Sequence, residues 1–123
     1  MRSLLSLPIA AVAVAFATAP GFCAGDAAKG EMDFAMCAVC HAKDMTNGVG
    51  PGLSGVIGRH AGSAPGFGYS PAMKNSNIVW DEKSLDTFIM APQSAVPGNT
   101  MPFPGIPGQQ ERSDLIAYLE TLK

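Results

Sequence analysis

The sequence predicts an all-α domain of about four short helices joined by long loops. Apolar residues recur at helical spacing in several short stretches, whereas no stretch shows the alternation of a half-buried strand and no segment is repeated. Glycine and proline are frequent, with 14 and 10 residues among 123, so connections without regular structure must join the helices. A chain of this length forms one small domain.

The N-terminal segment, residues 1–24, is predicted to be a secretory signal peptide. Arg2 precedes an apolar run from Leu4 to Phe16, and small residues follow it. An uncleaved membrane anchor is the alternative, but Pro8 interrupts the run, which is shorter than the roughly 20 apolar residues of a spanning helix. We therefore expect export, with no stable membrane insertion after cleavage.

Cleavage is expected between Phe22 and Gly25, which leaves residues 25–123 as a single domain. Cys23 suggests a lipidated N-terminus as an alternative, but the bulky Phe22 before it fits that poorly. We interpret Cys23 as a leftover thiol in or near the removed segment.

The first helix of the domain is predicted from Asp26 to about Ala38. Asp26 is a residue type that caps helix N-termini well. Apolar residues then recur at helical spacing, at Ala28, Met32, Ala35 and Met36. Two cysteines therefore lie at the C-terminal end of this helix.

A long loop, residues 42–68, follows the first helix. It is rich in glycine, contains Pro51 and Pro65, and has no periodic run long enough for a helix or strand. Because loops of this length inside a small domain are usually functional, we expect it to wrap a functional site.

Two helices are predicted in the middle of the chain. Ser70 and Pro71 suit the N-cap and first turn of a short helix that ends near Asn75. Asp81 begins another helix that continues to about Met90.

The last part of the chain combines a proline-rich stretch with a final helix. Five prolines between residues 92 and 107 are predicted to exclude regular structure there. A helix from about Gln109 to Leu122 places an apolar stripe on one face, made of Leu115, Ile116, Tyr118, Leu119 and Leu122. Four short helices bury little apolar surface, so we expect something else to complete the core.

The motif Cys37-Ala38-Val39-Cys40-His41 indicates covalent attachment of one haem c. C-x-x-C-H is the signature of c-type haem attachment. The two thiols lie on one side of the backbone, where each can form a thioether with one vinyl group of the same porphyrin. His41 then directs an imidazole nitrogen to the iron.

Three other interpretations of the cysteine pair fit less well. A thioredoxin-like redox pair expects a βαβ setting, which this chain lacks. A tetrahedral zinc site needs four ligands, and the only further histidine and cysteine are His60 and Cys23. A disulfide between Cys37 and Cys40 would leave the incomplete core unexplained.

Haem iron takes a second axial ligand unless it forms a ligand-binding site. Met101 is favoured because it lies in the nonhelical, proline-bounded segment PGNTMPFPG and because a soft thioether suits haem iron. Met73 and Met90 lie at helical positions where core packing is the ordinary role. Met45 is too close in sequence to His41, and His60 is interpreted as a surface residue. These four remain the alternatives: Met45, His60, Met73 and Met90.

Taken in order, these stretches resemble the bacterial class I cytochromes c, relatives of the mitochondrial electron carrier. GDAAKGEMDFAMCAVCH is similar to the family's opening helix and attachment motif, with Gly30 and Phe34 facing the last helix at Leu115 and Tyr118. PGNTMPFPGI resembles the segment that carries the methionine ligand. The resemblance covers essentially all of residues 25–123 and implies the class I cytochrome c fold, wrapped around one haem.

The resemblance also implies roles for further residues. GPGLSGVIGR is similar to the loop after the proximal histidine, so the Pro51 carbonyl should accept a hydrogen bond from the free ring nitrogen of His41. Phe103 matches an aromatic residue that covers the haem beside the methionine. Three residues match those that hydrogen-bond or neutralise the haem propionates: Arg59, Tyr69 and Trp80.

The chain departs from the mitochondrial pattern at several positions. Phe88 stands where those relatives have a tyrosine, and Met73 replaces a common polar residue, so the tuning of the iron should differ. Uncharged residues also replace lysines around the haem edge, which puts the basic docking ring in doubt: Gln93, Ser94 and Thr100.

We interpret the chain as a monomeric, periplasmic electron carrier rather than an enzyme, exchanging one electron at a time with redox partner proteins. Nucleic acid is not expected as a partner, because from Gly25 onward seven Lys and Arg residues face ten Asp and Glu residues, a net charge of −3. Two alternatives are a gas-binding or peroxidase-like haem enzyme with a weak Met101 bond, and a structural or sensory haem module of a larger complex.

Overall fold

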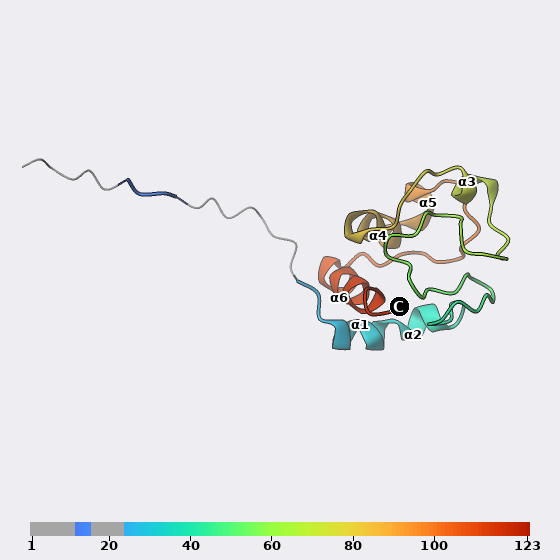
Figure 1. Cartoon of the computed structure of the whole chain (residues 1–123), viewed down its shortest axis with the longest axis horizontal. Helices are drawn as coiled ribbons and strands as arrows, with labels where there is room; N and C mark the ends of the chain where they lie inside the picture. The colour runs from blue at the N-terminus through green and yellow to red at the C-terminus, as the bar shows by residue number, and fades with distance from the viewer. Residues whose placement is uncertain (1–11, 16–23) are drawn as a thin grey trace, which may run out of the picture.

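The computed structural model describes residues 12–15 and 24–123, so the predicted signal peptide lies almost entirely outside the described residues (Figure 1). The described part contains six helices: α1 Ala27–Asp33, α2 Ala35–Ala38, α3 Pro71–Lys74, α4 Glu82–Met90, α5 Pro92–Ala95 and α6 Gln109–Leu119. Its only β pairing is an isolated bridge between His60 and Val79. The all-α prediction is therefore confirmed. None of the helices in these ranges is long and apolar enough to cross a membrane.

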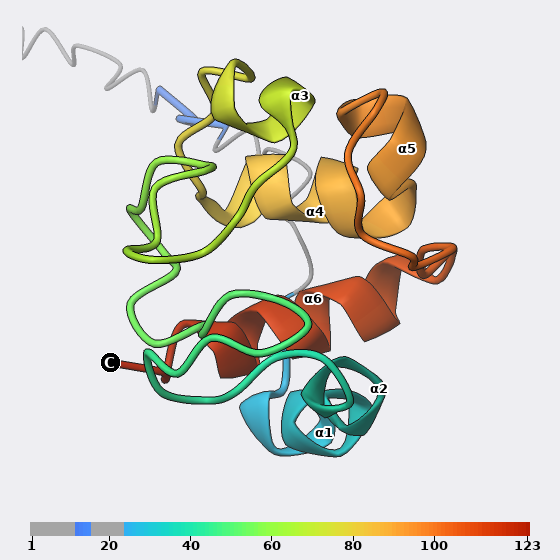
Figure 2. The same ribbon diagram turned by 90° about the vertical axis from the view of Figure 1, so that its right-hand side faces the viewer.

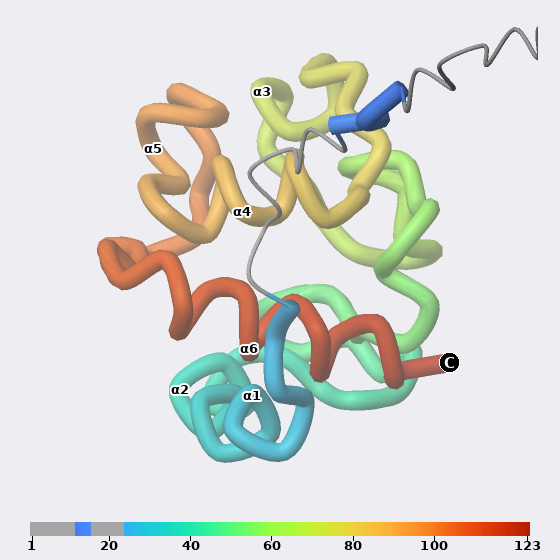
Figure 3. The backbone as a smooth tube through the Cα atoms, turned by 90° about the vertical axis from the view of Figure 1, so that its left-hand side faces the viewer, coloured from blue at the N-terminus to red at the C-terminus, as the bar shows by residue number. Residues whose placement is uncertain are grey.

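Helix α6 runs through the middle of the domain. Figure 2 shows α1 and α2 on one side of α6 and α4 on the other, with α3 and α5 beyond α4. The reverse view shows α1 crossing α6 as well (Figure 3). Gly30 permits this crossing because a Cβ at that position would collide with the Asp114 carbonyl. Phe34 and Tyr118 then pack with ring centroids 5.3 Å apart.

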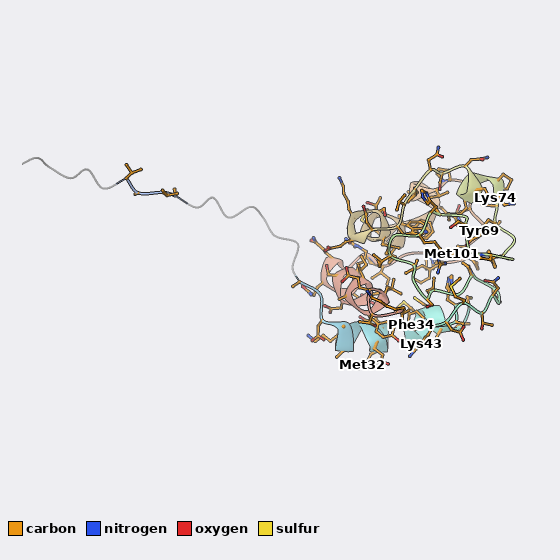
Figure 4. All side chains as sticks on the ribbon, viewed as in Figure 1. Met32, Phe34, Lys43, Tyr69, Lys74 and Met101 are labelled. Atoms are coloured by element: carbon orange, nitrogen blue, oxygen red, sulfur yellow. The ribbon has the colours of Figure 1, made fainter. Side chains whose placement is uncertain are left out.

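Lys43 covers the edge of this helix crossing. Its ammonium nitrogen lies 5.4 Å from the centroid of the Tyr118 ring and 5.9 Å from that of Phe34. The proximity of Phe34 and Lys43 is visible in Figure 4. An ammonium group over aromatic faces is attracted by their quadrupoles, so Lys43 adds to the contact between α1 and α6.

The predicted helix starts agree with the structure. Asp26 accepts hydrogen bonds from the N–H groups of Ala28 and Lys29, and Ser70 caps α3 in the same way. Asp81 forms a reciprocal capping box at the start of α4. Side-chain oxygens at these positions satisfy N–H groups that the helix itself leaves unpaired.

Three details of the predicted helices are wrong. The first helix is divided at Phe34 into α1 and α2. The proline-rich stretch contains α5, because Pro92 occupies its first turn, where an N–H is not needed. Helix α6 ends at Leu119 rather than Leu122.

Candidate functional site

A cavity of about 370 Å³ lies inside the domain, and all nine predicted site residues line it. Its walls are mainly apolar, with contributions from α2, α4, α6 and the long loops. The buried residues therefore surround a space rather than fill it, which agrees with the expectation that the chain alone does not complete its core. The nine residues are Cys37, Cys40, His41, Pro51, Arg59, Tyr69, Trp80, Met101 and Phe103.

The His41 imidazole is held by the loop that follows it. Its Nδ1 lies 2.7 Å from the Pro51 carbonyl oxygen, as the resemblance implied. Because a carbonyl only accepts, Nδ1 must carry the proton, and Nε2 keeps a free lone pair. Gly50 lies against the ring, since a Cβ there would come within 2.5 Å of His41 Cε1. Its N–H donates to the Cys40 carbonyl, which closes the loop locally.

The two cysteines of the motif lie at and just after the end of α2. Neither is bridged, and both are partly buried at the cavity wall. Burial, together with nearby Cys40 and Asp33, raises the pKa of Cys37 to about 11. At neutral pH the group is therefore a protonated thiol.

The structure separates the candidates for the second axial ligand. His60, Met45 and Met90 are exposed and do not line the cavity. Met73 lines it from α3, and Met101 lines it from the nonhelical loop after α5. Met101 and Tyr69 are labelled near each other in Figure 4. Of the candidates, both Met73 and Met101 place a thioether at the cavity, so the geometry alone does not choose between them.

Arg59 and Trp80 are brought together by backbone pairing. The Trp80 N–H donates to the Arg59 carbonyl at 2.9 Å, next to the His60–Val79 bridge. The Arg59 guanidinium donates to the carbonyls of Gly52 and Ser54, so it also fastens the loop after Pro51. This anchoring is a role that sequence reasoning missed.

Trp80 and Tyr69 retain hydrogen-bonding capacity at the cavity. The Tyr69 hydroxyl oxygen accepts from the Ala64 N–H at 3.1 Å, which leaves its own proton available. Trp80 also lines the cavity, and its indole N–H is a hydrogen-bond donor. Donors of this kind suit the carboxylates of a haem group.

Several cavity residues were not predicted to belong to the site. Met36 and Val39 line it and are 42% and 79% exposed, so they form part of its rim. Phe67 and Asn99 also contribute. Val39 lies inside the C-x-x-C-H motif, so its position beside the haem could have been predicted from the sequence. Phe67 and Asn99 are brought to the cavity by the fold of the loops, which no sequence motif indicates.

These residues fit a haem group. The cavity provides two thiols, one imidazole with a directed tautomer and the thioethers of Met36, Met73 and Met101, within mostly apolar walls. Thiols, imidazole and thioether are the donors that c-type haem uses. The Trp80 indole N–H and the Tyr69 hydroxyl supply polar groups at its wall.

Comparison with known proteins gives a consistent result. The profile of the cytochrome c family matches residues 27–123. The chain is 47% identical over 106 residues to cytochrome c2 of Rhodomicrobium vannielii, covering 85% of each chain. It is 48% identical over 102 residues to cytochrome c2 of Rhodoblastus acidophilus, covering 81% of this chain and 95% of that protein. Among solved structures, cytochrome cH from Methylobacterium extorquens matches with a TM-score of 0.77 and 47% identity, over 79% of this chain and 99% of the other.

Proposed function

The chain belongs to the cytochrome c family, and on this premise we propose that it is a periplasmic carrier with Cys37 and Cys40 as attachment points of its haem and His41 and Met101 as iron ligands. Family members are electron carriers that hold haem c covalently, so this protein is an electron-transfer protein and not an enzyme. Haem c supplies an iron that exchanges one electron between its ferrous and ferric forms.

The observation that carries the proposed ligand set is the convergence of the predicted donors on one cavity. The Pro51 carbonyl fixes the His41 tautomer and increases the basicity of Nε2. Met101 reaches the cavity from a segment restricted by Pro102 and Pro104. Ligands held this way keep their positions in both oxidation states, which keeps the reorganisation on electron transfer small.

The ligand set is tested by the absorption spectrum of the ferric protein, which should show the weak far-red band of a methionine–iron bond. Met101→Ala should abolish this band and allow the ferrous protein to bind carbon monoxide. Met73→Ala is the matched control, because Met73 also lines the cavity, and it should retain the band. If Met73→Ala loses the band and Met101→Ala keeps it, Met73 is the ligand. A wild-type protein without the band would favour the gas-binding or peroxidase-like alternative.

We also propose that partners dock at an uncharged rim, defined as the exposed cavity residues Met36, Val39, Thr100 and Pro102. The sequence from Thr87 to Gln110 contains no charged residue, and it includes two of the four rim residues, Thr100 and Pro102. Redox encounters use small, transient interfaces. A rim without charge favours apolar contacts over electrostatic steering.

Electron self-exchange between oxidised and reduced copies of the protein tests this docking mode without an identified partner. Its rate, measured from NMR line widths, should change less than about threefold as salt shortens the Debye length from about 30 Å to about 3 Å. Val39→Lys places one charge on the rim and should make the rate clearly salt-dependent. A steep dependence in the wild type would contradict the proposal.

The periplasmic location rests on residues 1–24, whose sequence has the form of a cleaved export signal. The intact mass of the mature protein tests it, because cleavage between Phe22 and Gly25 removes this segment.

A further inference from the structure

The Asn99 side chain lines the cavity and makes three hydrogen bonds. It is only 6% exposed. Its amide nitrogen donates to two carbonyl oxygens, that of Pro92 at 2.9 Å and that of Val96 at 2.8 Å. Its amide oxygen accepts from the Met101 N–H at 2.9 Å. The amide orientation is fixed, because a flip would oppose donor to donor and acceptor to acceptor.

The three bonds connect Met101 to a helix rather than to its own loop. Pro92 begins α5 and Val96 follows its last residue, and both are buried. The backbone of Asn99 is held as well, since its N–H donates to the Val96 carbonyl and its carbonyl accepts from the Gln93 side chain. The bond to the N–H two residues later is the Asx-turn arrangement, which sets the direction of the chain at Met101.

We propose that Asn99 is a positioning residue, which keeps the Met101 thioether on the iron by fixing the Met101 backbone to α5. This inference rests on the proposed function, in which Met101 is a ligand. Met101 has no helix or strand of its own to support it. Without the Asn99 side chain, the Met101 N–H loses its acceptor and the segment loses its two amide bonds to the Pro92 and Val96 carbonyls, so it can move away from the cavity.

The test uses an isosteric pair, Asn99→Thr and Asn99→Val, which differ in one hydroxyl. The threonine oxygen can still accept from the Met101 N–H, whereas valine offers no acceptor. Cyanide must displace the thioether from ferric iron, so its association rate reports how often Met101 leaves. We expect this rate to rise about tenfold in Asn99→Val, as the loss of about one buried hydrogen bond implies, and less in Asn99→Thr. The far-red band should weaken in the same order.

Asn47→Val is the matched control. The Asn47 amide also bridges two loop segments, donating to the Pro65 carbonyl and accepting from the Gly52 N–H, but it makes no contact with the Met101 segment. Its cyanide rate should stay within about twofold of the wild-type rate, since no bond to the Met101 segment is lost.

The outcomes separate the two proposals. If the wild type has the far-red band but both Asn99 variants bind cyanide at its rate, the positioning role is refuted while Met101 ligation stands. An equal increase in both variants supports the role and assigns it to the two amide bonds to the Pro92 and Val96 carbonyls, because both variants lack the amide nitrogen that makes them. If the wild type lacks the band, Met101 ligation fails and the positioning role fails with it.

Should Asn99→Val not fold, amide hydrogen exchange of Met101 in the wild type decides, and an unprotected amide refutes the role.

Discussion

The two walls of the cavity are held in different ways. The His41 side, residues 37–53, is fixed mainly by neighbours in sequence: Gly50 lies against the imidazole, its N–H reaches the Cys40 carbonyl, and Pro51 binds Nδ1. The Met101 side, residues 81–107, depends on contacts between helices as well as on the Asn99 bonds. The Ile106 N–H donates to the Ile89 carbonyl, and Arg112 on α6 donates to the carbonyls of Ile106 and Pro107.

This difference has a consequence for function. The His41 ligand is set by a local loop that forms with the motif itself, so it should persist through perturbations elsewhere. The position of the Met101 ligand depends on the contacts among α4, α5 and α6. Changes that break long-range contacts should therefore affect the sulfur side first, and changes inside the local loop should affect the imidazole side.

The largest loss of stability is expected for Arg112→Met. Arg112 Nε lies 2.7 Å from Asp86 Oδ1, with side-chain exposures of 6% and 18%. Removing the guanidinium leaves a mostly buried carboxylate and two carbonyls unpaired, at a cost of about 3 kcal/mol in the free energy of unfolding. Guanidinium chloride unfolding followed by circular dichroism measures it, and the far-red band should weaken before the Soret spectrum changes.

Arg112→Met combined with Asp86→Leu is the control for this effect. The double variant no longer buries an unpaired charge, so it should recover part of the lost stability. A single variant that loses less than about 1 kcal/mol would mean that the Met101 side does not depend on this ion pair.

The same contrast explains what the sequence could predict. The C-x-x-C-H motif is contiguous, so Cys37, Cys40 and His41 were assigned directly, and Pro51 followed from the resemblance. The caps Asp26, Ser70 and Asp81 act within three residues and were also predictable. Asn99 was missed because its partners are carbonyls at the two ends of α5, in a stretch where the prolines were predicted to exclude regular structure. The Arg59 anchoring was missed because its partners are backbone groups, which carry no sequence signal.

An intermediate loss of stability, together with a higher midpoint potential, is expected for Gly50→Ala on the His41 side. The new Cβ would lie 2.5 Å from Cε1 and 2.7 Å from Nδ1 of His41, so the ring must shift away from the Pro51 carbonyl. Overpacking of this kind costs about 1–3 kcal/mol. Losing the hydrogen bond makes the imidazole less basic, so the midpoint potential should rise in a redox titration.

Gly48→Ala tests whether this effect comes from the ring contact. A Cβ at residue 48 would meet no atom closer than the Cys40 carbonyl oxygen at 3.7 Å. This variant should keep the wild-type potential. Equal effects at both positions would point to the loop backbone instead of His41.

The smallest loss of stability is expected at Asp114, whose hydrogen bond joins the start of α1 to α6. Its carboxylate accepts from the Asp26 N–H at 2.8 Å and from the Gln110 amide at 2.9 Å. These bonds, with the charge of Lys29, hold the pKa of Asp114 below its ordinary value. A lowered pKa in the folded state stabilises the protein above the ordinary Asp value of about 3.9, and this contribution disappears as the pH falls through the folded-state pKa.

Asp114→Asn imitates the protonated acid at every pH, so it isolates this contribution. The wild type should be more stable than the variant near neutral pH, and the difference should shrink as the pH falls below about 4. Urea unfolding at a series of pH values measures it, with Asp33→Asn as the control, because the Asp33 side chain accepts no hydrogen bond within the described residues. A difference that is constant with pH would assign the effect to packing. Because Asp114 supports α1 and not the Met101 segment, the far-red band should remain unchanged in this variant, in contrast to Arg112→Met two residues away on the same helix.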